Sequence, residues 1–121
     1  MVPTNRKYTA NDEWLLEEDG KIKVGITDFA QHELGDIVFV DLPGVGDEFN
    51  AGDDFAVVES VKAAAEIYTQ VTGKVVAVNE ALNDDPALLN ADAWNNYIAV
   101  FEGAIEGEVM DAAAYEAKIA G

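Results

Sequence analysis

Short apolar segments, most of them rich in β-branched residues, recur along the chain at close spacing. Lys21–Thr27 alternates strictly and puts Ile22, Val24 and Ile26 on one face, as in a half-buried strand. The other candidate strands are Ile37–Leu42, Phe55–Val61, Ala65–Val71, Gly73–Val78 and Tyr97–Phe101. Turn-forming residues separate several of them, at 42–44, 51–53 and 72–73. Many short strands at this spacing predict a small sandwich or barrel.

Three segments carry helix signals instead, namely an N-terminal cap, a proline in the first turn or a terminal glycine. They are 28–34 (capped by Thr27 or Asp28 and stopped by Gly35), a helix that begins at Asp85-Pro86, and 111–120. The last has the strongest signal, because Asp111 is a good N-cap, three alanines follow it and Gly121 comes after it. We therefore expect short helices added to a β framework, with one helix at the C-terminus.

Composition excludes several kinds of chemistry. The 121 residues include no cysteine and one histidine, so disulfides, thiolate or multi-histidine metal sites and a cysteine nucleophile are excluded. The formal net charge of −17 opposes binding to nucleic acid or to an anionic membrane. Residues 1–11 lack the apolar stretch of a secretory signal, which predicts a cytoplasmic location. We interpret His32, the one histidine, as a surface or packing residue, and we predict no catalytic residue and no metal ligand.

One lysine stands apart from the other charged residues. Between Val24 and Gly73 the chain has ten acidic residues and one basic residue, Lys62. Lys62 lies between two strand-like runs, where a tight hairpin would present it at the tip. Its neighbours are small and apolar, and the turn that the strands require contains no glycine, asparagine or proline. An isolated lysine is usually an ordinary surface residue, but this setting favours a presented amine.

The residues around Lys62 resemble the attachment site of lipoyl carrier domains. Glu59–Ala63, with Gly46 before it and Gly73 after it, is the part of the chain that carries this likeness. Further blocks are similar to the H-protein family of the glycine cleavage system: Val24–Asp28, Ala30–Gln31, Leu34–Pro43, Asn79–Leu82 and Ala114–Ala117. The resemblance runs from about Lys7 to the C-terminus.

The resemblance implies an all-β dominated fold, a lipoyl-domain-like barrel-sandwich hybrid with short helices and a C-terminal helix. Residues 1–121 would form a single lipoyl-carrier domain, with the lipoyl hairpin at about 55–78 and the C-terminal helix at about 108–120. Lipoic acid joined to Lys62 by an amide would supply the thiol chemistry that a chain without cysteine lacks.

The family's function would make the chain a carrier and not an enzyme. Glycine decarboxylase would load an aminomethyl group onto the lipoyl arm, aminomethyltransferase would remove it, and dihydrolipoyl dehydrogenase would reoxidise the arm. A lipoate-attaching enzyme would modify Lys62, and the carrier itself would be a monomer. One tethered arm that visits three enzymes has a high effective concentration at each of them.

The resemblance also assigns roles to other residues. Glu59 and Glu66, on either side of Lys62, would be read by the lipoate-attaching enzyme, and solubility of the hairpin is the alternative. Gly46 and Gly73 would serve the turns that pair the two halves around the lysine, since glycine allows a positive φ or a close backbone approach. Glu13 would hold the cationic amine of the loaded arm in a cleft by a charge-assisted hydrogen bond, or it is an ordinary solvated acid.

Several alternatives remain open at this point. An H-like carrier could serve other lipoate-dependent complexes. Biotin carriers share the hairpin lysine, but they usually place it between methionines, unlike Val61 and Ala63. An unmodified acidic interaction module would not need Lys62 at all. A free-standing enzyme is disfavoured, because the chain shows no nucleophile–base pair and no phosphate-binding loop.

Overall fold

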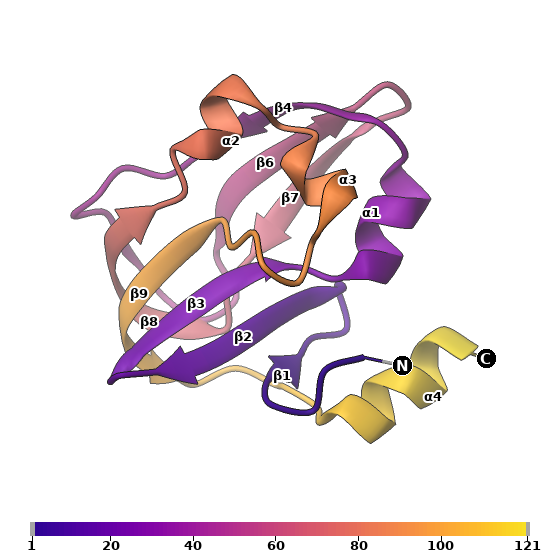
Figure 1. Ribbon diagram of the computed structural model, residues 1–121. Coiled ribbons are helices and arrows are strands. Elements are labelled where there is room, and N and C mark those ends of the chain that lie inside the picture. Colours follow the sequence, from indigo (N-terminus) through magenta and orange to yellow (C-terminus); the bar gives the residue numbers. More distant parts are fainter. Residues whose placement is uncertain (1, 121) are drawn as a thin grey trace.

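Two antiparallel sheets make up the β framework of the computed structural model, which describes residues 2–120 (Figure 1). The larger sheet has the spatial order β1 (Lys7–Tyr8), β2 (Glu13–Glu18), β3 (Lys21–Ile26), β9 (Ala99–Ile105), β8 (Val71–Val78) and β5 (Glu48–Phe49). The smaller sheet has the order β4 (Ile37–Asp41), β6 (Asp54–Ser60) and β7 (Ala64–Tyr68). The helices are α1 (Asp28–Leu34), α2 (Ala81–Asp84), α3 (Leu88–Ala91) and α4 (Ala112–Ala120). This architecture confirms the predicted β-dominated fold with short helices and a C-terminal helix.

The main core lies between the two sheets. Val24, Val58, Val75 and Phe101 are fully buried, and they come from both sheets. Phe101 makes an edge contact with Phe55, with ring centroids 5.3 Å apart, so the aromatic rings join the two sheets directly. Each large apolar side chain removed from water contributes roughly 1.5–3 kcal/mol. The alternation seen in Lys21–Thr27 therefore marks the inward face of β3, on which Ile22, Val24 and Ile26 are buried.

A second apolar cluster fixes α4 to β1 and β2. The rings of Tyr8 and Tyr115 stack 4.8 Å apart, and Trp14 is buried in the same cluster. Met110 exchanges two backbone hydrogen bonds with Tyr8, at 2.9 and 2.8 Å. This bridge holds the chain extended just before the helix, so α4 begins at Ala112 and not at about residue 108.

The strands differ from the predicted ones in their ends. β7 stops at Tyr68 and β8 begins at Val71, so the turn lies at residues 69–70 and not at 72–73. The segments that form β1, β2 and β5 have no alternating pattern, so the sequence does not predict these strands. In β2, three consecutive residues from Glu13 to Leu15 are buried, because the strand is covered on both faces. Among the described residues, no helix is long and apolar enough to cross a bilayer.

Candidate functional site

Strands β6 and β7 form a hairpin (Figure 1). Lys62 lies in the turn at its tip, between Ser60 and Ala64. The turn closes through a hydrogen bond of 2.8 Å from Ser60 N to Ala63 O. The Ser60 hydroxyl oxygen accepts hydrogen bonds from the backbone N–H groups of Lys62 and Ala63, both at 3.1 Å. A serine side chain that pairs with nearby backbone groups can replace the usual turn residues. This explains how the hairpin turns tightly without glycine, asparagine or proline.

The lysine turn rests on the C-terminal end of α1. Lys62 is exposed, and its Nζ donates a hydrogen bond of 3.1 Å to the carbonyl oxygen of Glu33 in the last turn of that helix. Val61 N donates to Asp36 O at 3.0 Å, directly after the helix. Gly35, with φ of +77°, ends α1, and a Cβ there would lie 3.1 Å from Lys62 Cε. Of the two predicted N-caps, Thr27 caps α1 and Asp28 is its first residue, and the predicted stop at Gly35 is confirmed. The end of this helix positions the lysine.

Asn90 supports this platform from α3. Its Oδ1 accepts a hydrogen bond of 2.9 Å from Ile37 N, and its Nδ2 donates to Gln31 Oε1 and to Gly35 O, both at 2.9 Å. The three bonds tie the end of α1 to the start of β4, which are the segments that contact Lys62 and Val61. No local pattern in the sequence predicts this role, because the partners lie up to 59 positions away from Asn90.

Replacing Asn90 with alanine is expected to lower the free energy of unfolding by about 2 kcal/mol, because it leaves buried backbone groups unpaired. The amides of Ile37 and Val61 are expected to exchange with solvent faster in the folded protein. Amide hydrogen exchange followed by NMR measures both effects. Asn83→Ala, an exposed position on α2, is the control. Equal protection of Ile37 and Val61 in the two variants would contradict a supporting role of Asn90.

Glu59 and Glu66 lie on the outer face of the smaller sheet. Glu59 is opposite Ala64, and Glu66 is opposite Val57, two positions before Glu59, so both carboxylates point outward on the same face. Both are exposed. Glu66 accepts a long hydrogen bond of 3.4 Å from the Tyr68 hydroxyl, and its charge raises the pKa of Tyr68. Among residues 2–120 no carboxylate forms an ion pair with Lys62, so the carboxylates of Glu59 and Glu66 face solvent.

Gly46 and Gly73 have different structural roles. Gly46 lies just before a strand of the larger sheet, and Gly73 lies within one. Gly46, with φ of +97°, lies in an exposed turn before β5 and donates to Val75 O at 2.8 Å. Gly73 lies inside β8, opposite Gly103, and a Cβ there would overlap the carbonyl oxygen of Glu102. The turn predicted at Gly73 is therefore wrong, since the glycine permits a close approach of two strands. Recognition of either glycine by an attaching enzyme stays a prediction.

Glu13 is fully buried in β2, with 0% of its surface exposed. The Thr9 hydroxyl donates to Oε1, and Tyr68 N donates to Oε2 at 3.1 Å. Burial raises the pKa of Glu13, and the two hydrogen bonds oppose that shift. The carboxylate thus ties β2 to the end of β7. Because none of the surface of Glu13 is exposed, an amine on an arm would reach this carboxylate only if the surrounding segments moved, and its role in an arm cleft stays a prediction.

Glu13 is expected to make the protein less stable as the pH rises. Because its pKa is raised in the folded state, the folded protein keeps this proton to a higher pH than the unfolded chain, whose value is near 4.5. The contribution is complete below about pH 4.5 and is lost as the pH passes through the folded pKa. Glu13→Gln removes it, so the free energy of unfolding of the variant relative to the native protein should increase from pH 4.5 upward.

Urea denaturation of both proteins between pH 4 and pH 8 measures this difference. Glu17→Gln, exposed on the same strand, controls for the loss of one negative charge. A difference for Glu13→Gln that does not vary with pH would contradict the raised pKa. A difference that decreases with pH would show a shift in the opposite direction.

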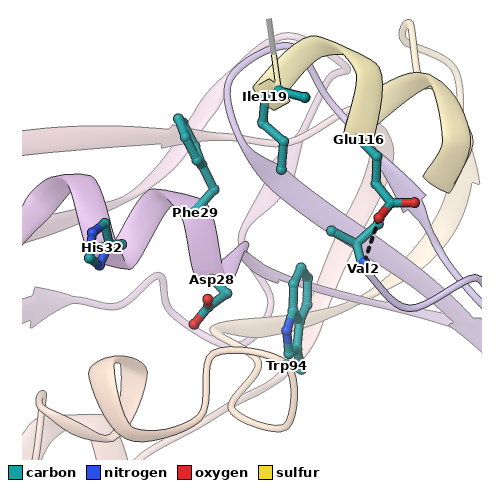
Figure 2. A pocket seen from close by; sticks show the side chains of 8 residues that line it. Val2, Asp28, Phe29, His32, Trp94, Glu116 and Ile119 are labelled. Carbon is teal, nitrogen blue, oxygen red and sulfur yellow. Dashed lines mark hydrogen bonds between the residues drawn. The ribbon is translucent and has the colours of Figure 1, made fainter.

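His32 lines a hollow on another side of α1 (Figure 2). The hollow has a volume of about 440 Å³ and lies between α1, the loop at Trp94 and α4, which contributes Ile119. Figure 2 shows Phe29, Trp94 and Ile119 around the space, with His32 at its edge on the helix. The described residues that line the hollow include neither Lys62 nor Glu13. The structure therefore does not bring His32 together with the predicted site residues.

Proteins with similar sequences and structures identify the family to which this chain belongs. The chain matches the family model described as glycine cleavage H-protein over residues 6–119. It is 53% identical to the glycine cleavage system H protein of Cronobacter sakazakii over 121 residues, which cover 96% of this chain and 94% of that protein. The H protein of Psychrobacter sp. is 58% identical over 94 residues, 77% of this chain and 75% of that one. The crystal structure of a glycine cleavage system H protein from Mycobacterium marinum is similar with a TM-score of 0.94 and 35% identity, covering 99% of this chain and all of that one (100%). The chain therefore belongs to the glycine cleavage H-protein family, the non-catalytic lipoyl carriers of the glycine cleavage system.

Proposed function

We propose that Lys62 is the residue through which this chain carries lipoic acid. The observation that supports this most is the exposed Nζ at the tip of a defined hairpin, held by one hydrogen bond to Glu33 O. Ala63 and Ala64 follow it and are exposed, so no bulky side chain on that side blocks an approach to the amine. These residues fit an amide-linked group, because attachment needs an accessible amine and a rigid support but no enclosing pocket.

The chain holds Lys62 in an exposed position. The lipoyl group supplies the disulfide–dithiol chemistry that a protein without cysteine lacks. Attachment forms a bond between the neutral Nζ and the carbonyl carbon of an activated lipoyl group. The bond from that carbon to the leaving group breaks. Nζ releases two protons to solvent, one when the ammonium becomes neutral and one when the amide forms. Lys62 then loses its positive charge and the charge-assisted part of its contact with Glu33 O. The lysine side chain is therefore freer to leave α1 after modification.

The mass of the intact protein tests this assignment. The protein is incubated with a bacterial lipoate-attaching enzyme, lipoate and ATP, and the product is digested and mapped. A gain of one lipoyl amide on the peptide that contains Lys62 is the expected result. An unchanged mass, while a control lipoyl domain is modified by the same enzyme, would overturn the proposal.

We further propose that the attaching enzyme reads Glu59 and Glu66. Both carboxylates are exposed on the outer face of the hairpin and do not pair with Lys62. Each is thus available to a basic group on the enzyme. Glu59→Gln is expected to lower kcat/KM for attachment by about fivefold, as for the loss of one interfacial charge pair. Glu48→Gln, exposed on β5, is the matched control, and an equal effect of the two variants would show a general response to net charge.

The partners that follow from family membership are three enzymes: glycine decarboxylase, aminomethyltransferase and dihydrolipoyl dehydrogenase. The net charge of −17 favours partner surfaces that are basic around the entrance to the active site. Association should then weaken as salt is added, because exposed charges are screened. The rate of reoxidation by dihydrolipoyl dehydrogenase at 20 and 200 mM salt tests this charge-based encounter.

A further inference from the structure

Large apolar side chains are concentrated around the lysine turn. Among residues 2–120, four large hydrophobic residues are strongly exposed: Val38 (56%), Phe39 (50%), Val45 (65%) and Val61 (68%). Three of the four lie in the turn that carries Lys62 or in β4, the strand paired with β6. We refer to Val38, Phe39 and Val61 as the turn patch. An exposed cluster of this kind in a small acidic protein indicates a contact surface.

The strand register brings the turn patch together. Phe39 is opposite Glu59 in the smaller sheet, and Ile37 is opposite Ser60. The register shifts between Ile37 and Phe39, which leaves Val38 exposed at the irregularity. Val61 follows Ser60 and is bound through its N–H to Asp36 O. The patch thus spans the start of β4 and the turn that carries Lys62.

The sheet face beside the patch is acidic. Phe39, Glu59 and Ala64 form one cross-strand row on the outer face. Asp41, Val57 and Glu66 form the next row. The carboxylates are exposed, and the small side chain of Ala64 leaves Phe39 and Glu59 uncovered on that side. A complementary partner would present an apolar depression with basic groups along its rim.

We propose that the turn patch is the docking surface of the lipoate-attaching enzyme. This inference rests on the proposed attachment at Lys62. A lysine side chain extends its Nζ roughly 6 Å from its Cα, and reaction needs the two reacting atoms within about 3.5 Å. The attaching enzyme therefore has to contact the residues that surround the turn. Enzymes that act on the sulfur atoms of the lipoyl group bind the far end of its acyl chain. Because that end is distant from Lys62, these enzymes do not need to contact the turn patch.

The test compares variants in which an exposed apolar residue is replaced by threonine. Phe39→Thr and Val61→Thr lie in the patch, and Val61→Thr is nearly isosteric. Val45→Thr is the matched control, because Val45 is equally exposed but lies in the loop between β4 and β5. Initial rates of lipoate attachment are measured by intact mass on folded proteins, checked by thermal denaturation. Phe39→Thr is expected to lower kcat/KM about tenfold, mainly through KM, and Val61→Thr severalfold. Val45→Thr should stay within about twofold of the native protein.

The same variants, fully modified with excess attaching enzyme, are then assayed with dihydrolipoyl dehydrogenase. An unchanged KM in that assay supports a surface used in attachment. Normal attachment rates for both Phe39→Thr and Val61→Thr would overturn the proposal. A raised KM for the dehydrogenase alone would also overturn it and assign the patch to that enzyme. If the native protein accepts no lipoate, the attachment at Lys62 itself fails, which this experiment distinguishes from failure of the patch.

Discussion

Replacing Lys62 with arginine is expected to abolish lipoate attachment and all glycine cleavage that depends on this chain. The guanidinium remains protonated at every accessible pH, so it cannot act as the nucleophile that forms the amide. It can still donate to Glu33 O, so the turn and its support on α1 should persist. The expected loss is complete, down to the level without carrier. Isotopic exchange between glycine and bicarbonate, catalysed by glycine decarboxylase, measures it.

Lys74→Arg is the matched control, since Lys74 is also exposed and lies on β8, away from the hairpin tip. This variant should exchange carbon as fast as the native protein after lipoylation. Exchange by Lys62→Arg above the carrier-free level would contradict the assignment of Lys62 and would point to another amine. A normal thermal denaturation of Lys62→Arg would show that its loss of exchange is chemical and not a failure to fold.

The parts of the site that depend on neighbouring residues could be read from the sequence. The cap at Thr27, the stop at Gly35 and the presented Lys62 are all encoded within a few positions. Thr27 Oγ1 accepts from Ala30 N at 3.1 Å, and Gly35 N donates to Gln31 O at 3.0 Å. Such local patterns survive in any fold that forms the same turn or helix. In the same way, the strand-like runs on both sides of Lys62 are sufficient to predict the lysine at a hairpin tip.

The parts that depend on distant residues could not be read in this way. Asn90 follows two leucines and gives no local signal, yet it binds Ile37, which is 53 positions away. Glu13 resembles a surface acid in a chain with 24 acidic residues, but strand pairing buries it against Tyr68 N. In both cases the sheet topology brings together a polar side chain and an unpaired backbone group. Because buried backbone groups require partners, the fold selects these polar residues through contacts that no periodicity reveals.

Gly73→Ala is expected to destabilise the fold strongly, even in a protein that never meets an attaching enzyme. A Cβ at this position would overlap Glu102 O and lie 2.9 Å from Gly103 Cα, so β8 and β9 would have to separate. The obstacle is backbone, which cannot turn aside as a flexible side chain can. We expect the free energy of unfolding to fall by about 3 kcal/mol or more. Urea denaturation of the unmodified protein measures this loss.

Gly46→Ala separates the two possible roles of the flanking glycines. Gly46 has a positive φ, but a Cβ added there would meet open space, so only backbone strain opposes a side chain. A cost of about 1–2 kcal/mol is expected. If Gly73 acts through strand pairing, Gly73→Ala should lose clearly more stability than Gly46→Ala before any lipoylation. Near-native stability of Gly73→Ala combined with slow attachment would instead show that the enzyme reads Gly73 directly. The pairing of Gly73 with Gly103 favours a role in strand pairing, because β8 and β9 both lack a side chain at the same position. Recognition by an enzyme would require a glycine on only one of the two strands.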